Sequence, residues 1–97
     1  MVKLGISIRL KARPGKEKET TEFLKSILPL AIEETGTINW YAVQFTQDTF
    51  GIFDTFETED DRHMHHTGPV AKALMTNATE LLCEPPLVEL FEILAAK

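Results

Sequence analysis

Three histidines and three acids share one short segment of the chain. They are His63, His65 and His66, together with Glu59, Asp60 and Asp61. On a helix, residues four positions apart are neighbours, so Glu59 would meet His63 and Asp61 would meet His65. Imidazole with carboxylate suits several divalent ions, but His65 and His66 would point about 100° apart on a helix. We therefore predict no metal site, and interpret His63 and His66 as part of a solvated turn.

His65 is the histidine best placed for acid–base chemistry. It lies four residues before Pro69, just ahead of a predicted helix break at Thr67-Gly68-Pro69, where a side chain can turn inward toward a sheet. Because imidazole ionises near neutral pH, we interpret His65 as a general base that removes a proton from a substrate. The alternative is a histidine at the edge of the core whose hydrogen bonds are satisfied.

Asp54 falls inside an apolar strand, on the same face as Ile52 and Phe56. A buried carboxylate is costly unless it is paired, so we predict a partner, either Arg9 or a backbone amide. Asp54 and Arg9 are accordingly candidates to orient the substrate or the base. A purely structural ion pair is the alternative.

Three aromatic residues are predicted to line an apolar substrate pocket: Trp40, Phe53 and Phe56. Trp40 could instead be a core residue. The five glycines are scattered and form no phosphate-binding loop, and no Gly-x-Ser-x-Gly nucleophile motif occurs. We therefore expect no cofactor.

Six elements must position these side chains. Residues 2–13 alternate between apolar and polar types, which is typical of a strand. Helical spacing covers 16–34, with a break at Pro29, and continues from 58 to 82 with an interruption at 67–69. Residues 38–45, 50–56 and 87–95 are predicted strands. This βαββαβ order predicts an α+β, ferredoxin-like fold with a four-stranded antiparallel sheet.

The later strands are apolar on both faces. Phe50 and Ile52 face opposite to Phe53, and Trp40 faces opposite to Tyr41. In a sheet with helices on one side, the other face should be polar unless something covers it. A second copy of the same sheet is the simplest cover, so we predict a homodimer.

Composition limits the other function classes. Ninety-seven residues give a single domain, 1–97, and the net charge of −5 argues against nucleic acid or an anionic membrane as a partner. RNA-recognition domains share the βαββαβ order, but the run from Asp48 to Thr55 lacks their basic residue and second stacking aromatic. Cys83 is the sole cysteine, and no signal-peptide or membrane-spanning run occurs, so we expect a cytoplasmic protein.

Four segments resemble the antibiotic biosynthesis monooxygenase family, in particular its small quinol monooxygenase-like members. They are Lys11-Ala12-Arg13-Pro14-Gly15-Lys16-Glu17, Glu33-Glu34-Thr35-Gly36-Thr37-Ile38-Asn39-Trp40, Phe50-Gly51-Ile52-Phe53-Asp54-Thr55-Phe56, and His65 with Pro69. Together they span essentially the whole chain in the family's order. The resemblance implies a dimeric α-β barrel with a pocket between sheet and helices.

This chain also departs from the family pattern. Trp40 stands where many members have Tyr, Phe56 where many have Trp, and Val70 where some have a second His. The family's haem-degrading branch has Trp at the position of His65 and His at that of Met75, so haem cleavage is not expected.

The resemblance and the residues together favour a cofactor-independent monooxygenase that oxidises a small phenol, quinol or polyketide-like aromatic with O2. His65 would deprotonate the hydroxyl inside a dry pocket. Two alternatives remain open at this point: a non-catalytic dimer that binds small apolar molecules, and a cyclase or isomerase that uses the same pocket without O2.

Overall fold

Four strands and two broken helices follow each other in the predicted βαββαβ order. They are seen in a computed structural model that describes residues 2–97. The elements are β1 (Leu4–Lys11), α1 (Glu17–Ser26), α2 (Leu28–Glu33), β2 (Asn39–Gln44), β3 (Thr49–Phe56), α3 (Glu59–His66), α4 (Pro69–Leu81) and β4 (Leu87–Glu92).

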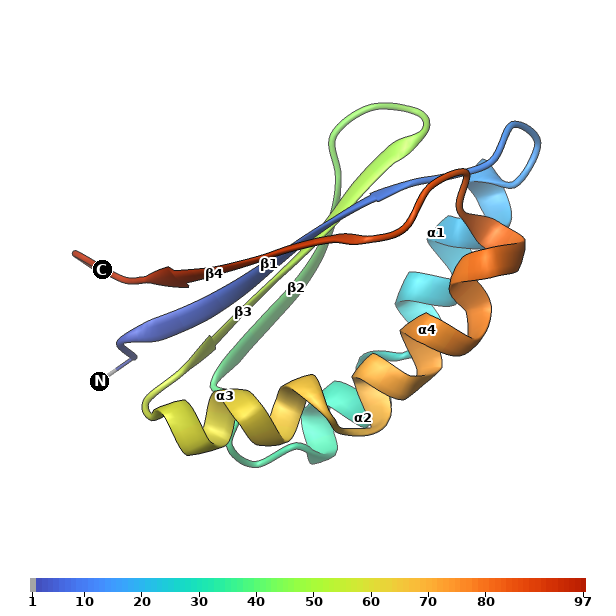
Figure 1. Cartoon of the computed structure of the whole chain (residues 1–97). Coiled ribbons are helices and arrows are strands. Elements are labelled where there is room, and N and C mark those ends of the chain that lie inside the picture. Colours follow the sequence, from blue (N-terminus) through green and yellow to red (C-terminus); the bar gives the residue numbers. More distant parts are fainter. Residues whose placement is uncertain (1) are drawn as a thin grey trace.

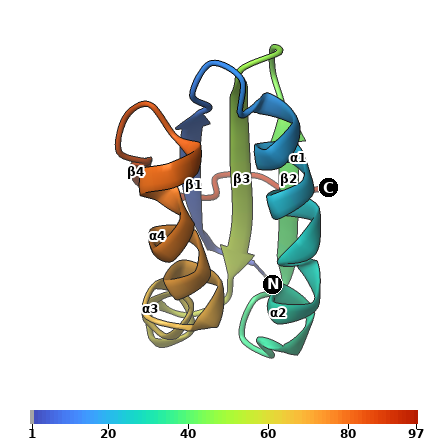
Figure 2. The ribbon, with the colours of Figure 1, turned by 90° about the vertical axis from the view of Figure 1, so that its right-hand side faces the viewer.

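The strands form one antiparallel sheet in the order β2-β3-β1-β4. The helices all lie on one side of this sheet (Figure 1). Seen from the helix side, α1 and α2 run over the β2 edge, whereas α3 and α4 run over the β1 edge (Figure 2). The predicted ferredoxin-like α+β fold is therefore confirmed.

Prolines set both helix breaks. Pro29 is in the first turn of α2, which begins at Leu28, directly after α1 ends at Ser26. Pro69 is likewise the first residue of α4, with Gly68 in extended backbone before it. A proline lacks the backbone N–H that a continuing helix needs but is tolerated in a first turn, where that N–H has no partner. The second break lets α3 and α4 take different directions (Figure 1).

The core lies between the sheet and the helices. Alternate residues of β1 and β3 point toward the helices, and Leu10, Phe50, Ile52 and Phe56 are almost completely buried there. Burying one such side chain stabilises the fold by about 1.5–3 kcal/mol. Asp54 belongs to this same series, which places a carboxylate in the apolar layer.

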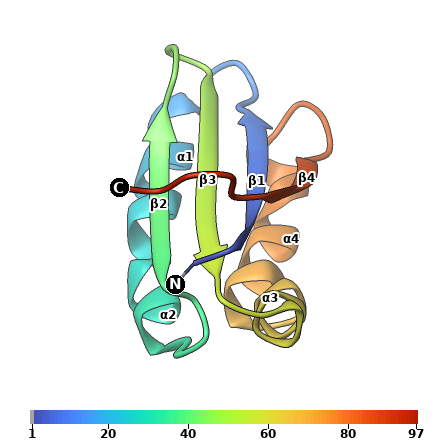
Figure 3. The same ribbon diagram turned by 90° about the vertical axis from the view of Figure 1, so that its left-hand side faces the viewer.

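No helix of the described residues covers the other face of the sheet (Figure 3). Tyr41 is 57 % exposed there and Phe53 37 % exposed, and the two are directly opposite each other on β2 and β3. Phe45 packs edge-to-face on Phe53, with 6.4 Å between ring centroids. The predicted apolar character of both faces is therefore present in the structure.

The helices among residues 2–97 are all too short or too polar to cross a membrane.

Candidate active site

His65 occupies the last turn of α3 and turns inward. The helix begins well because Thr58 caps it, accepting a hydrogen bond from the Asp61 N–H at 3.1 Å, and because acids fill its first turn. After His66 the chain leaves the helix, and the His65 side chain is only 4 % exposed. The imidazole therefore reaches the core from the end of a short polar helix.

Two carboxylates hold this imidazole from opposite sides. Nε2 lies 2.8 Å from Oδ2 of Asp54, and Nδ1 forms an ion pair with Oε1 of Glu34. The hydroxyl of Thr37 lies 3.2 Å from Nδ1. The Nε2–Asp54 contact has the length of a charge-assisted hydrogen bond but not its alignment, so we describe it as an ion-pair contact. Glu34, His65 and Asp54 thus form an acid–imidazole–acid triad.

The triad favours the charged imidazolium. Burial by itself would lower the pKa of His65, because desolvation disfavours a cation. The hydrogen-bonding capacity and charge of Asp54, followed by those of Glu34, outweigh this effect and raise the pKa above its usual value of 6.5. With both ring nitrogens protonated, His65 can donate to both carboxylates at once.

Glu34 is held at the start of α4. Its Oε2 accepts a hydrogen bond from the Val70 N–H at 3.4 Å, where the helix N-terminus favours a negative charge. Gly68 permits this approach, because a Cβ at that position would lie 3.0 Å from the same oxygen and 2.9 Å from the Met64 carbonyl oxygen. The break between α3 and α4 thus helps to place Glu34 as well as His65.

Asp54 is fully buried, and its carboxylate is only partly satisfied. Neither of its oxygens has a hydrogen-bond partner among residues 2–97, although Oδ2 has the ion-pair contact with His65, and the indole Nε1 of Trp40 also has none. Trp40 and Asp54 are directly opposite each other on β2 and β3. A buried donor and a buried acceptor therefore remain unpaired on neighbouring residues.

The structure places Arg9 away from this triad, so the predicted Arg9–Asp54 pair is wrong. The β1 residue opposite Asp54 is Ile6. Arg9 is three positions further along β1, opposite Gly51, and three is an odd number. Successive side chains of a strand point to opposite faces. Arg9 is therefore on the open face, where its guanidinium lies 4.4 Å from the centroid of the Phe45 ring.

The three predicted pocket aromatics are likewise divided between the faces. Phe56 is buried with its ring centroid 5.2 Å from that of His65, and Trp40 packs against the helix-side core. Phe53 is on the open face with Tyr41. The expected pocket formed by all three does not exist, because Phe53 and Phe56 are three residues apart in β3, an odd number that places their side chains on opposite faces of the sheet.

Glu34 is the site residue that sequence reasoning missed. It is one of 15 acids in the chain and follows the last residue of an amphipathic helix, where an acid is unremarkable. Only the packing of the α2 end against α3 brings it to His65. Its position in a segment that resembles a known family was the sole signal available.

A cleft of about 350 Å³ opens beside the triad. Its lining includes Glu34, Thr37, Met64, His65 and Pro69. The cleft lining combines the charged and polar side chains of Glu34 and His65 with the apolar side chains of Met64 and Pro69. It connects the Glu34 side of the triad with solvent.

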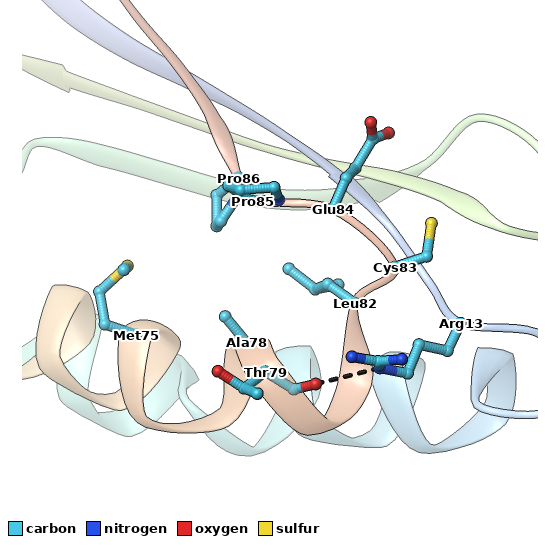
Figure 4. Close-up of a pocket in the computed structure, with 9 residues that line it drawn as sticks. All are labelled: Arg13, Met75, Ala78, Thr79, Leu82, Cys83, Glu84, Pro85 and Pro86. Carbon is cyan, nitrogen blue, oxygen red and sulfur yellow. Dashed lines mark hydrogen bonds between the residues drawn. The ribbon is translucent and has the colours of Figure 1, made fainter.

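A second cavity, of about 330 Å³, lies between α4 and the segment that leads into β4 (Figure 4). Ala78, Leu82 and Pro86 make much of its wall, and the Arg13 Nε–H donates to the Thr79 carbonyl oxygen at 3.0 Å. The Cys83 thiol and the Glu84 carboxylate point away from it (Figure 4). This cavity therefore has less acid–base capacity than the cleft beside the triad.

His63 and His66 are exposed and line a hollow of about 310 Å³ together with Glu59 and Asp60 of α3 and with Ile6 and Leu90 of the sheet. Within residues 2–97, no group of three His, Cys, Asp or Glu side chains is arranged to hold a metal ion.

Comparison with known proteins identifies several similar structures. A protein of unknown function from Nitrosomonas europaea is 49 % identical, with a TM-score of 0.97 over 100 % of this chain and 94 % of that one. A proposed antibiotic biosynthesis monooxygenase from the same organism is 14 % identical, with a TM-score of 0.84 over 95 % and 99 %. Another, from Caulobacter crescentus, is also 14 % identical, with a TM-score of 0.82 over 97 % and 92 %.

The two likenesses at 14 % identity show a shared fold. No family model and no curated protein sequence matches the chain.

Proposed function

We propose that this chain, which belongs to the same family as the Nitrosomonas europaea protein of unknown function and has the antibiotic biosynthesis monooxygenase fold, is a cofactor-independent monooxygenase. Its substrate would be a small electron-rich aromatic with a free hydroxyl, such as a quinol or a polyketide-like phenol. The observation that carries this proposal is the buried Glu34–His65–Asp54 triad, which joins the apolar core to an open cleft.

The first step is removal of the hydroxyl proton. Both ring nitrogens of His65 already face carboxylates, Nε2 toward Asp54 and Nδ1 toward Glu34, so neither is free to accept this proton. Oδ1 of Asp54 is the free acceptor, and it is fully buried beside Phe56 and His65. The role first given to His65 therefore passes to Asp54, and His65 holds that carboxylate in place.

Glu34, at the other end of the triad from Asp54, connects the site with solvent. Glu34 has a side chain that is 13 % exposed and lines the cleft, so it can exchange protons with water. Uptake of a proton by Asp54 can be matched by release at Glu34 through the two ring nitrogens of His65. A proton can thus leave to solvent at Glu34 when the buried Asp54 takes one up, and a proton can return by the same route when the peroxide is protonated.

For a quinol the reaction balances without an added reductant: quinol and O2 give a hydroxyquinone and water. The quinol anion passes one electron to O2, and the resulting radical and superoxide join at a ring carbon to form a peroxide. The peroxide anion takes up one proton, which replaces the one given to Asp54. The hydroperoxide then loses water together with the hydrogen of the same ring carbon, which leaves one oxygen atom on the ring. A low-dielectric surrounding protects the reactive pair, and Phe56 and the apolar face of Trp40 supply it.

We further propose that the open sheet face packs on that of a second copy to give a homodimer. Tyr41, Phe45 and Phe53 form an exposed aromatic patch on a face that no described helix covers. Exposed apolar surface of this kind marks interaction sites, and a two-fold dimer buries the same patch on both copies. The free thiol of Cys83 suits the reducing cytoplasm in which we place this protein.

Oxygen consumption by the purified protein tests the oxygenase. With a panel of quinols and phenols, at least one compound should be consumed with one O2 per molecule. Asp54→Asn should lower that rate by roughly 100-fold or more, the usual scale of a lost acid–base group. Asp48→Asn is the matched control, because the Asp48 carboxylate lies in the turn between β2 and β3 and accepts hydrogen bonds from the hydroxyls of Thr46 and Thr49.

Three other outcomes would contradict the proposed oxygenase, and two of them would indicate another function. Conversion of the compound without O2 would indicate the cyclase or isomerase. Tight binding without turnover, unchanged in His65→Ala, would indicate the non-catalytic binding protein. A folded protein that consumes no O2 with any compound of the panel would not be an oxygenase of this class.

A further inference from the structure

We infer that the indole N–H of Trp40 and Oδ1 of Asp54 together bind the reacting oxygen of the substrate, so that the site selects a free hydroxyl. This inference rests on the proposed function, because it assigns the position of the hydroxyl that is to be ionised. It gives Trp40 a hydrogen-bonding role that the sequence did not predict.

Three buried side-chain atoms lack a hydrogen-bond partner among residues 2–97: Trp40 Nε1 and both oxygens of Asp54. Oδ2 contacts His65 Nε2, which leaves Trp40 Nε1 and Asp54 Oδ1 as the donor and the acceptor to be explained. Buried polar groups in folded proteins are almost always paired, so two such atoms on neighbouring residues require an explanation. Ligand sites are among the places where such groups occur.

Strand register places the two residues side by side. Trp40 and Asp54 are directly opposite on β2 and β3, and both side chains point to the helix side of the sheet. The Cβ atoms of such a pair are about 4.5–5.5 Å apart. An indole donor and a carboxylate acceptor therefore start from adjacent positions on one face.

The surrounding groups cannot supply the missing bonds. His65 uses one nitrogen toward Asp54 and the other toward Glu34, and the Thr37 hydroxyl is engaged with His65 and Glu34. Ile6, on the other side of Asp54, is apolar. The partner for both atoms must therefore come from outside the described residues.

A hydroxyl is the group that fits this pair. It accepts a hydrogen bond from the indole N–H through its oxygen and donates its own hydrogen to the carboxylate. When the proton passes to Asp54, the indole N–H remains directed at the developing oxyanion, the arrangement that favours its formation. A methyl ether can use only the donor, and a plain hydrocarbon can use neither atom.

Access to this position lies next to the cleft. His65 contacts Asp54 and lines the cleft together with Thr37, which is three residues before Trp40. Neither Trp40 nor Asp54 is part of the cleft lining, so a substrate whose ring occupies the cleft has to extend its hydroxyl past His65 to reach the β2–β3 pair.

The single tryptophan makes a direct test available. The chain has one Trp, so one indole N–H resonance in a ¹⁵N-labelled sample reports on this site without assignment. The probes are 1-naphthol, 1-methoxynaphthalene and naphthalene, which differ in the hydroxyl. We expect 1-naphthol to bind at least tenfold more tightly than the other two and to move the indole resonance downfield.

Two variants make the test specific. Trp40→Phe should lower the affinity for 1-naphthol at least tenfold and abolish its preference over the methyl ether. Tyr41→Phe is the matched control, because it removes one polar group from the adjacent aromatic residue on the open face and should change neither. Melting temperatures show whether each variant is folded. The shift of the indole resonance is measured on the unmodified protein, so this part of the test does not depend on any variant folding.

The possible outcomes separate this inference from the proposed function. Equal affinities for the three probes, an unmoved indole resonance, or no binding of 1-naphthol would each overturn the inference, whatever the oxygen assay shows. Turnover of a quinol that is unchanged in a folded Trp40→Phe variant would also overturn it while leaving the oxygenase intact. The predicted resonance shift together with no O2 consumption would retain the hydroxyl site and remove the oxygenase.

Discussion

Nε2 of His65 lies 2.8 Å from Oδ2 of Asp54, and this contact ties the end of α3 to the centre of β3. Both side chains are almost completely removed from water. Neither would be stable there alone, since an isolated buried charge is far more costly than a paired one. Their pairing, with Glu34 on the far side of the ring, explains how a polar helix end can lie against an apolar sheet.

The stability of the protein should fall as the pH rises above neutrality. The pKa of His65 is raised in the folded protein relative to its usual value of 6.5, so the folded state holds a proton that the unfolded state releases. The resulting stabilisation is complete below pH 6.5 and is lost as the pH passes through the raised folded value. Urea unfolding between pH 6 and 9 measures this decline.

A variant without the imidazole supplies the control for that experiment. In His65→Gln the decline attributed to this group should disappear, whereas His63→Gln, which changes an exposed histidine of the same helix, should retain it. A free energy of unfolding that increased across the same interval would contradict the assignment of a protonated His65.

Replacement of Glu34 by Gln should lower the pKa of His65. The substitution keeps the shape of the side chain but removes the negative charge next to Nδ1. We expect a loss of about 1–3 kcal/mol in the free energy of unfolding, the usual cost of weakening a buried hydrogen bond to a charged group. NMR titration of the imidazole measures the pKa directly.

Glu33 provides the comparison, because Glu33→Gln removes the same charge from the neighbouring residue of the same cleft. Its effect on His65 should be small by comparison. Equal effects of the two variants would mean that His65 responds to the general charge of the cleft rather than to its contact with Glu34.

An acid on the open sheet face should dissociate the proposed homodimer. Phe53→Asp places a charge within the aromatic patch of Tyr41, Phe45 and Phe53, where its burial in an interface would be strongly unfavourable. Sedimentation equilibrium should give twice the chain mass for the unmodified protein and the chain mass for the variant.

Ile32→Asp is the matched control on the helix layer, because Ile32 in α2 is 71 % exposed on the opposite side of the molecule. This variant should remain dimeric. The face-to-face dimer would be excluded by an unmodified protein that is monomeric at high concentration, or by Phe53→Asp remaining dimeric.

Loss of the α3 cap should destabilise the helix that carries His65. Thr58→Ala removes the hydroxyl that accepts the Asp61 N–H, and we expect a cost of about 1 kcal/mol. Thr76→Ala removes an exposed hydroxyl that donates to the Lys72 carbonyl oxygen inside α4, and it should cost less. Thermal and urea unfolding of both variants test this difference, and a larger loss for Thr76→Ala would contradict the capping role.

The sequence by itself determined the elements and their order. Period-two alternation in the first strand, helical spacing on either side of Pro29, and the interruption at Thr67-Gly68-Pro69 depend on local physics, and all three appear in the structure. Asp54 was correctly predicted to share a buried face with Ile52 and Phe56, because facing within one strand follows from residue parity alone.

Only the tertiary structure decided which of these residues meet. The partner of Asp54 is His65 and not Arg9, because the β1–β3 register places Arg9 opposite Gly51 and so on the other face. Register depends on how two strands slide past each other, which neither strand encodes by itself. Glu34 joins the site through the packing of α2 against α3 and α4, contacts between residues about thirty positions apart that no local pattern specifies.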